Sequence, residues 1–290
     1  MSNHNAVALE GSSLRSEEFF ARNVVAPFSP QAVLDVLLGK SPICHLKGFF
    51  DRNTCSTIRR NFWENPGLRE RGDQVAGYVV GAYHYGLSTL DYLHECQATR
   101  KHVESLFTGA RDPVARLEAL LVRAAAPTGR VVRRARHQGM EAARCAATSW
   151  SAPGEFLLAP HDDVAQVGAK EQRGFEIQQV ARHTVVGVNL YCSMPPVGGE
   201  LELWNISPNR ACRARLGIEE RGHPYDVEQL RSFQSMLLAV APGDCVLLNG
   251  GFVHGVRGTG NGVPIALDER RLILTLFVGI KDDETILWWT

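Results

Sequence analysis

Two histidines and one aspartate have the residue types and the spacing of a metal site. His161 and Asp163 stand two positions apart, directly after an apolar run. On an extended backbone such residues face the same side, so an imidazole and a carboxylate can meet one ion. His254 comes much later, at the end of a second apolar stretch. Two imidazoles and one carboxylate on one face of an octahedron leave three positions open, which suits Fe(II) that must bind a bidentate oxoacid and O₂ together.

An arginine at the start of a later apolar strand is a candidate anchor for an anion. Arg271, Ile273 and Thr275 share one face of that strand by the two-residue period. The guanidinium can hold the distal carboxylate of a keto-diacid through two parallel hydrogen bonds, with the Thr275 hydroxyl as a further donor. The neighbouring Arg270 is the rival, but its face continues with leucines. We therefore favour Arg271.

Taken in order, these motifs resemble the Fe(II)/2-oxoglutarate-dependent dioxygenases. The resemblance covers roughly residues 145–280 and consists of His161-x-Asp163, Gly198-Gly199-Glu200-Leu201-Glu202-Leu203-Trp204-Asn205, Pro242-Gly243-Asp244, His254 and the Arg271 strand. It implies a double-stranded β-helix (jelly roll), with His161, Asp163 and His254 as iron ligands and Arg271 as the anchor for the C5 carboxylate of 2-oxoglutarate. O₂ would be the second co-substrate, with succinate and CO₂ released.

The layout narrows the substrate within that family. A helical N-terminal half before a compact jelly roll resembles the standalone bacterial enzymes that modify free small molecules, and also the carrier-independent halogenases. Those halogenases replace the triad carboxylate with Gly or Ala, whereas this chain keeps Asp163. We therefore expect hydroxylation of an amino acid, an alkaloid or another natural-product intermediate. Desaturation, epoxidation and cyclisation remain alternative outcomes.

Two competing functions remain open. A non-catalytic, cupin-like metal-binding protein would keep the histidines but has no need of Arg271. An oxygenase acting on protein side chains would keep the same chemistry, yet the sequence has no acidic or basic groove signature and no peptide-binding appendage.

The elements that must position these residues divide the chain in two. Residues 1–144 are predicted to be a mainly helical region with a lid at 77–91, and residues 145–290 to be the double-stranded β-helix core, together one integrated α+β domain. Helices are expected over 31–38, 51–63 and 113–126 because apolar residues recur at helical spacing after capping residues. Strands are expected over 146–151, 155–159, 184–192, 200–206, 236–241, 245–249 and 271–280, interrupted by a polar insertion at 205–235 with a short helix around 226–231.

Six further residues are candidates for contacts around the iron. Asn189 and Tyr191 share a face of the strand over 184–192, so either can bond 2-oxoglutarate or substrate. Pocket-lining positions are expected in the lid and among the aromatic residues of the core: His84, Tyr85, Trp150 and Trp204. Simple packing is the alternative for these aromatic residues and for His84.

Composition excludes several classes of protein. Lys+Arg 31 balances Asp+Glu 31, which argues against a nucleic-acid binder because that function needs a basic surface. The apolar runs are far shorter than the roughly 20 residues of a membrane span, and the N-terminus lacks a signal-peptide pattern. The seven cysteines are scattered without a Cys-x-x-Cys pair, which favours reduced thiols in the cytoplasm. The Trp288–Trp289 pair fits either closure of the barrel end or a homodimer contact.

Overall fold

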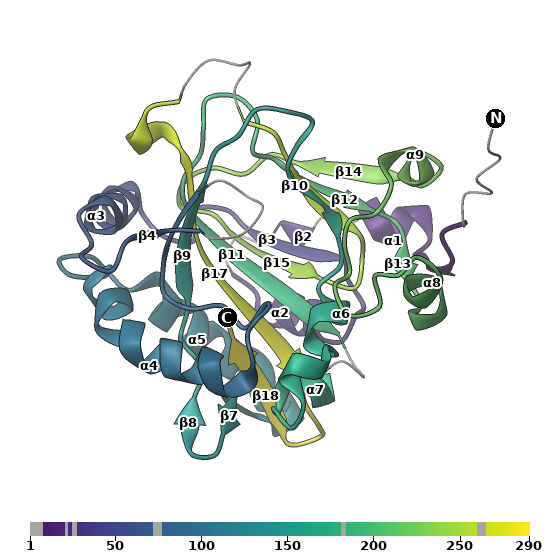
Figure 1. Ribbon diagram of the computed structural model, residues 1–290, viewed down its shortest axis with the longest axis horizontal. Coiled ribbons are helices and arrows are strands. Elements are labelled where there is room, and N and C mark those ends of the chain that lie inside the picture. The colour runs from purple at the N-terminus through teal and green to yellow at the C-terminus, as the bar shows by residue number, and fades with distance from the viewer. Residues whose placement is uncertain (1–7, 21–22, 25–27, 72–76, 181–183, 260–264) are drawn as a thin grey trace.

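Two sheets face each other and enclose a core. The computed structural model describes residues 8–20, 23–24, 28–71, 77–180, 184–259 and 265–290. The larger sheet has the order β2 (Asn23–Val24), β3 (Ile43–Leu46), β15 (Cys245–Asn249), β11 (Val185–Ser193), β17 (Arg271–Ile280), β9 (Ala146–Trp150), β5 (Gly77–Val80) and β4 (Arg69–Glu70), with β18 (Thr285–Trp289) on β17 and β6 (Val131–Arg134) on β18. The smaller sheet has the order β10 (Phe156–His161), β16 (His254–Arg257), β12 (Leu201–Trp204) and β14 (Ser235–Leu238). This is the expected double-stranded β-helix with helices added (Figure 1).

The inner faces of both sheets supply one apolar cluster. It includes Tyr191 and Ile273 from the larger sheet and Leu203 and Val256 from the smaller one. Alternate residues of the same strands face the other way, because successive side chains of a strand point to opposite faces. The inner face of β17 therefore carries Arg271, Ile273 and Thr275, as predicted.

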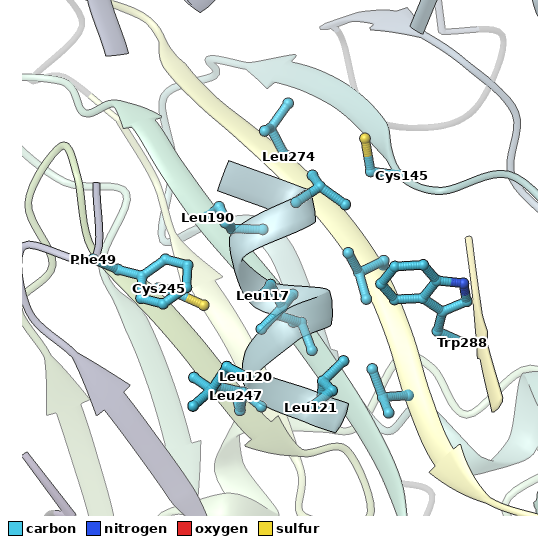
Figure 2. Close-up of a cluster of buried hydrophobic side chains, with 14 of the residues drawn as sticks. Phe49, Leu117, Leu120, Leu121, Cys145, Leu190, Cys245, Leu247, Leu274 and Trp288 are labelled. Carbon is cyan, nitrogen blue, oxygen red and sulfur yellow. The ribbon is translucent and has the colours of Figure 1, made fainter. Parts of the chain in front are cut away.

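The outer face of the larger sheet is covered by helices α2 (Pro30–Leu37), α3 (Arg52–Trp63) and α5 (Pro113–Ala125). Figure 2 shows Leu117 and Leu121 of α5 against Leu190 of β11 and Leu274 of β17. Residues from both predicted halves share this cluster. The boundary between residues 144 and 145 itself stays a prediction.

The three helices begin where their capping residues predict. The side chains of Ser29, Asp51 and Asp112 each accept a hydrogen bond from a backbone amide in the first turn of α2, α3 and α5. Sequence analysis missed α4 (Thr89–Ser105), because its buried face is only weakly apolar. The buried positions follow helical spacing but include a threonine and a cysteine: Thr89, Tyr92, Leu93, Cys96 and Val103. The segment 77–91 is therefore only partly a loop: it begins with β5 and ends in the first turn of α4.

The remaining elements are short. They are α1 (Ser16–Phe20), α6 (Val164–Val167), α7 (Ile177–Val180), α8 (Arg210–Arg215) and α9 (Val227–Leu230), with the strand pairs β1 (Gly11–Ser12) with β13 (Ser207–Pro208) and β7 (Arg136–His137) with β8 (Met140–Glu141). Trp288 and Trp289 lie on β18 and are buried inside this chain, so they close the sheet. Every helix in the described ranges is too short or too polar to serve as a membrane span.

Candidate metal centre

His161, Asp163 and His254 converge at one end of the smaller sheet. His161 ends β10 and His254 begins β16, and the two residues are direct partners in the antiparallel ladder. One ligand atom from each of the three side chains lies within 4.8 Å of the others. His254 Nε2 is 3.4 Å from one oxygen of Asp163, and His161 Nε2 is 3.9 Å from the other. The three ligand atoms are thus close enough to one another to bind a single metal ion.

Both imidazoles are held in the form that binds a metal. Nδ1 of His161 is 2.9 Å from the carbonyl oxygen of Ala159, and Nδ1 of His254 is 2.9 Å from that of Phe252. A carbonyl only accepts, so each Nδ1 carries the proton and each Nε2 presents a lone pair. Burial lowers the pKa of both histidines to about 4. They are therefore neutral ligands at neutral pH.

Asp163 is a buried carboxylate that lacks a cationic partner. Only 4 % of it is exposed, and burial raises its pKa to about 7. In the described part of the chain, the side chains at its oxygens are the two neutral histidines and Gln166, whose amide donates at 2.9 Å. A divalent ion would supply the missing positive charge, so this nitrogen and oxygen donor set fits Fe(II).

Glycines make room for the carboxylate. A Cβ atom at Gly250 would lie 2.5 Å from Asp163 Oδ2, and one at Gly187 would lie 3.1 Å from it. The Asp163 amide also donates to the Gly250 carbonyl at 2.8 Å. The glycine pair after Asn249 therefore positions the ligand by close backbone approach, as glycine within a sheet often does.

Arg271 is a buried guanidinium that has no counter-ion among the described residues. It is 1 % exposed, and among the described residues its Nε and Nη1 atoms have no hydrogen-bond partner. The guanidinium lies over the rings of Trp150 and Tyr191, at 5.2 and 5.4 Å from their centroids. Burial lowers the pKa of Arg271. A buried positive charge is stabilised by a bound anion, and a carboxylate can accept two parallel hydrogen bonds from the planar guanidinium.

The inner surface of the larger sheet runs from Arg271 to the Asp163 ligand of the triad. Tyr191 is paired with Ile273, and Asn189 with Thr275, along β11 and β17. Further along the same two strands, Gly187 is paired with Phe277, next to Asp163. A short diacid chelated at the triad therefore has an inward-facing path towards Arg271.

Comparisons with known proteins agree with this geometry. No model of a protein family matches the chain. The chain is 27 % identical over 252 residues to an L-isoleucine 3(1)-dioxygenase of Pantoea ananatis, covering 84 % of this chain and 82 % of that protein.

The sequence is therefore similar to that of an amino-acid dioxygenase, and the site has the residues expected of an Fe(II)/2-oxoglutarate-dependent dioxygenase.

Two solved structures are similar to this chain. An N-substituted L-amino acid dioxygenase from Burkholderia ambifaria matches with a TM-score of 0.52 at 14 % identity, covering 90 % of this chain and 91 % of that one. A 2OG-Fe(II) oxygenase-family oxidoreductase from Burkholderia pseudomallei has a TM-score of 0.49 at 15 % identity, covering 93 % and 98 %. The first of these likenesses shows the jelly-roll fold of the enzyme.

The structure separates the four predicted pocket residues. Trp150 lies against Arg271, whereas Tyr85 is 42 % exposed and contacts His223. Trp204 is a correction: it points to the opposite face of β12 from the core and packs with Ile206 and Tyr225 beneath the insertion. It therefore does not line the site.

His84 faces into the protein. Its Nδ1 lies 2.8 Å from the Thr290 carbonyl oxygen, and burial lowers its pKa to about 4. Its ring stands edge-on to Phe277, with centroids 5.6 Å apart, and among the described residues its Nε2 has no partner. His84 thus packs behind the inner face of β17.

Tyr83 and Asp162 are residues that sequence analysis missed. The Tyr83 hydroxyl bonds the Thr148 side chain, and its ring lies 5.3 Å from the Arg71 guanidinium, which also covers Trp150. Tyr83 could have been predicted from Tyr85, because residues two positions apart on an extended backbone face the same side. Asp162, between the two ligands in the sequence, points away from the metal site towards Tyr225 and Arg213.

Asp162 instead ties the 205–235 insertion to the ligand segment. It is 1 % exposed, and one oxygen accepts from the amides of Val164 and Ala165 at the start of α6. Its other oxygen accepts from the Tyr225 hydroxyl at 2.6 Å and faces an Arg213 nitrogen at 3.5 Å. No sequence motif marks these long-range partners.

Proposed function

We propose that the enzyme hydroxylates an unactivated C–H bond of a free aliphatic amino acid, with Fe(II), 2-oxoglutarate and O₂. The observation that carries this is a buried triad of two histidines and one carboxylate beside the inner surface that carries Arg271, a buried arginine whose Nε and Nη1 atoms have no hydrogen-bond partner among the described residues. The name of the Pantoea relative, an L-isoleucine dioxygenase, supports an amino-acid substrate. Alkaloids and other natural-product intermediates are the remaining small-molecule classes.

Each residue has a distinct task in this proposal. His161, Asp163 and His254 hold the iron, and Arg271 holds the distal carboxylate of 2-oxoglutarate. When bound, the iron and 2-oxoglutarate supply the oxidising equivalent from O₂, with succinate and CO₂ released. Asp163 would occupy the iron coordination position that is open to a halide ion in the halogenases, so hydroxylation is favoured over halogenation.

The surrounding residues orient the co-substrate and exclude water. Thr275, Asn189 and Tyr191 lie on the inner face between Arg271 and the triad, where their side chains can donate to 2-oxoglutarate. The Trp150 and Tyr191 rings shield the guanidinium from solvent. In such a dry site the ion pair between arginine and carboxylate is stronger than it would be in water.

The test of the ligand assignment is spectroscopic. Anaerobic Fe(II) and 2-oxoglutarate should give the weak visible charge-transfer band of the chelate with the wild-type enzyme. His161→Ala and Asp163→Ala should abolish it, whereas His94→Ala, an exposed histidine on α4, should not. An intact band in both ligand variants would refute the assignment.

The test of the activity is product formation. Succinate and hydroxylated amino acid should appear together when L-isoleucine is added aerobically. A protein that binds metal but forms no succinate with any substrate would be the cupin-like alternative. Desaturation, epoxidation or cyclisation would be recognised from the product mass.

We also propose that the enzyme works in the cytoplasm. All seven cysteines are free and buried, which suits a reducing compartment. Association into a homodimer stays a prediction that rests on sequence alone.

A further inference from the structure

The 205–235 insertion is attached to the ligand-bearing segment through its backbone. Two hydrogen bonds of 2.9 Å join the segments, from the amide of Asp162 to the carbonyl of Gly222 and from the amide of Tyr225 to the carbonyl of Pro160. The Tyr225 hydroxyl adds its bond to the Asp162 carboxylate. The insertion therefore runs alongside the residues that carry the first iron ligand.

His223 is the side chain that the insertion places at this point. It lies between the two bonded positions and is partly buried. Burial is the main cause that lowers the pKa of His161, and the nearby His254 and His223 lower it further. His223 is thus close enough to a metal ligand to act on its charge.

Tyr85 reaches the same imidazole from the lid segment. Its hydroxyl is 2.6 Å from His223 Nε2, and the two ring centroids are 6.0 Å apart. Two residues earlier, Tyr83 lies close enough to Arg271 to favour its charge. The short segment from Tyr83 to Tyr85 therefore spans from the arginine end of the site to the triad end, where it meets His223.

We propose that His223 binds the carboxylate of the amino-acid substrate. In this assignment the Tyr85 hydroxyl is the donor in its hydrogen bond with Nε2, which leaves the ring proton on Nδ1 to be donated to a carboxylate oxygen beside the iron. Arg221, exposed two residues earlier, contributes positive charge at His223 and favours an anion there. This inference rests on the proposed amino-acid substrate and assigns the group that recognises it.

The test compares an acid with its amide. His223→Leu should raise KM for L-isoleucine about tenfold, the effect of one hydrogen bond to a charged group. KM for L-isoleucinamide, which lacks the anion, should be nearly the same in the variant and the wild type. KM for 2-oxoglutarate and the charge-transfer band should not change.

Two further variants separate recognition from packing. His223→Asn keeps an N–H near the position of Nδ1 and should hold KM for L-isoleucine within about threefold of wild type. His94→Leu is the matched control, since His94 is exposed on α4, and it should behave as wild type.

Each outcome decides a different claim. Equal increases in KM for the acid and the amide, or none for either, would overturn the role of His223 and leave the proposed function standing. If the wild type shows the charge-transfer band but no standard L-amino acid stimulates succinate formation, the amino-acid assignment fails, and this inference fails with it.

Discussion

Replacing Arg271 with methionine should weaken 2-oxoglutarate binding without destabilising the protein. Two charge-assisted hydrogen bonds to the distal carboxylate contribute about 3 kcal/mol or more, so Kd should rise at least about 100-fold. Without 2-oxoglutarate, the wild-type guanidinium is buried, and its Nε and Nη1 atoms find no partner in the part of the chain that the structure describes. Its desolvation costs several kcal/mol, which two cation–π contacts of about 2 kcal/mol each roughly offset. The free energy of unfolding of the ligand-free protein should therefore change little or increase.

Thermal unfolding with and without 2-oxoglutarate measures both effects. With Mn(II) as a redox-inert metal and 2-oxoglutarate at about 100 times Kd, the wild type should gain about 2.7 kcal/mol, or roughly 5 °C in Tm. Arg271→Met should lose that gain and keep the Tm of the ligand-free protein. Arg270→Met, at the neighbouring position on the other face, is the control and should respond as wild type. A variant that keeps the 2-oxoglutarate shift, or loses several kcal/mol without ligand, would refute the reasoning.

Three further predictions test individual contacts. The folded-state pKa of His84 is about 4 against an ordinary 6.5. Its contribution to stability is therefore present above pH 6.5 and is lost as the pH falls, because the unfolded chain binds the proton first. Between pH 7 and pH 5, the free energy of unfolding measured in urea should fall by about 2 kcal/mol less for His84→Asn than for the wild type. Gly250→Ala should displace Asp163 and weaken metal binding at least tenfold by calorimetry, whereas Gly168→Ala, whose Cβ has its nearest neighbour at 3.5 Å, should not. Asp162→Asn should lower the free energy of unfolding by about 2–3 kcal/mol, because its amide nitrogen would face the tyrosine hydroxyl and the guanidinium of the insertion; an unchanged urea midpoint would contradict this.

Local chemistry explains what could be predicted from the sequence. Asp51 and Asp112 predict the starts of two helices because a capping side chain accepts hydrogen bonds from the backbone amides that follow it. The strands at 245–249 and 271–280 were predicted with the observed bounds because both are continuous apolar runs. The inward orientation of Arg271 followed from the two-residue period alone.

The missed features depend on partners far away in the chain. β16 carries His254 but consists of only four residues, and its pairing with β10 and β12 defines it. Trp204 looked like a pocket wall because aromatic residues line many pockets, yet the register of β12 turns it towards the insertion. His223 had no neighbour at ligand spacing, and only the backbone bonds near His161 bring it to the site.

The most direct test of the central claim is a crystal structure of the enzyme prepared without oxygen with Fe(II) and 2-oxoglutarate, with anomalous scattering collected at the iron edge. We predict one iron peak bonded at about 2.1 Å to Nε2 of His161, Nε2 of His254 and an Asp163 oxygen, the usual range for first-row metals. The distal carboxylate of 2-oxoglutarate should lie on the Arg271 guanidinium. An iron peak away from these three side chains, or a 2-oxoglutarate that leaves Arg271 unpaired, would contradict the account.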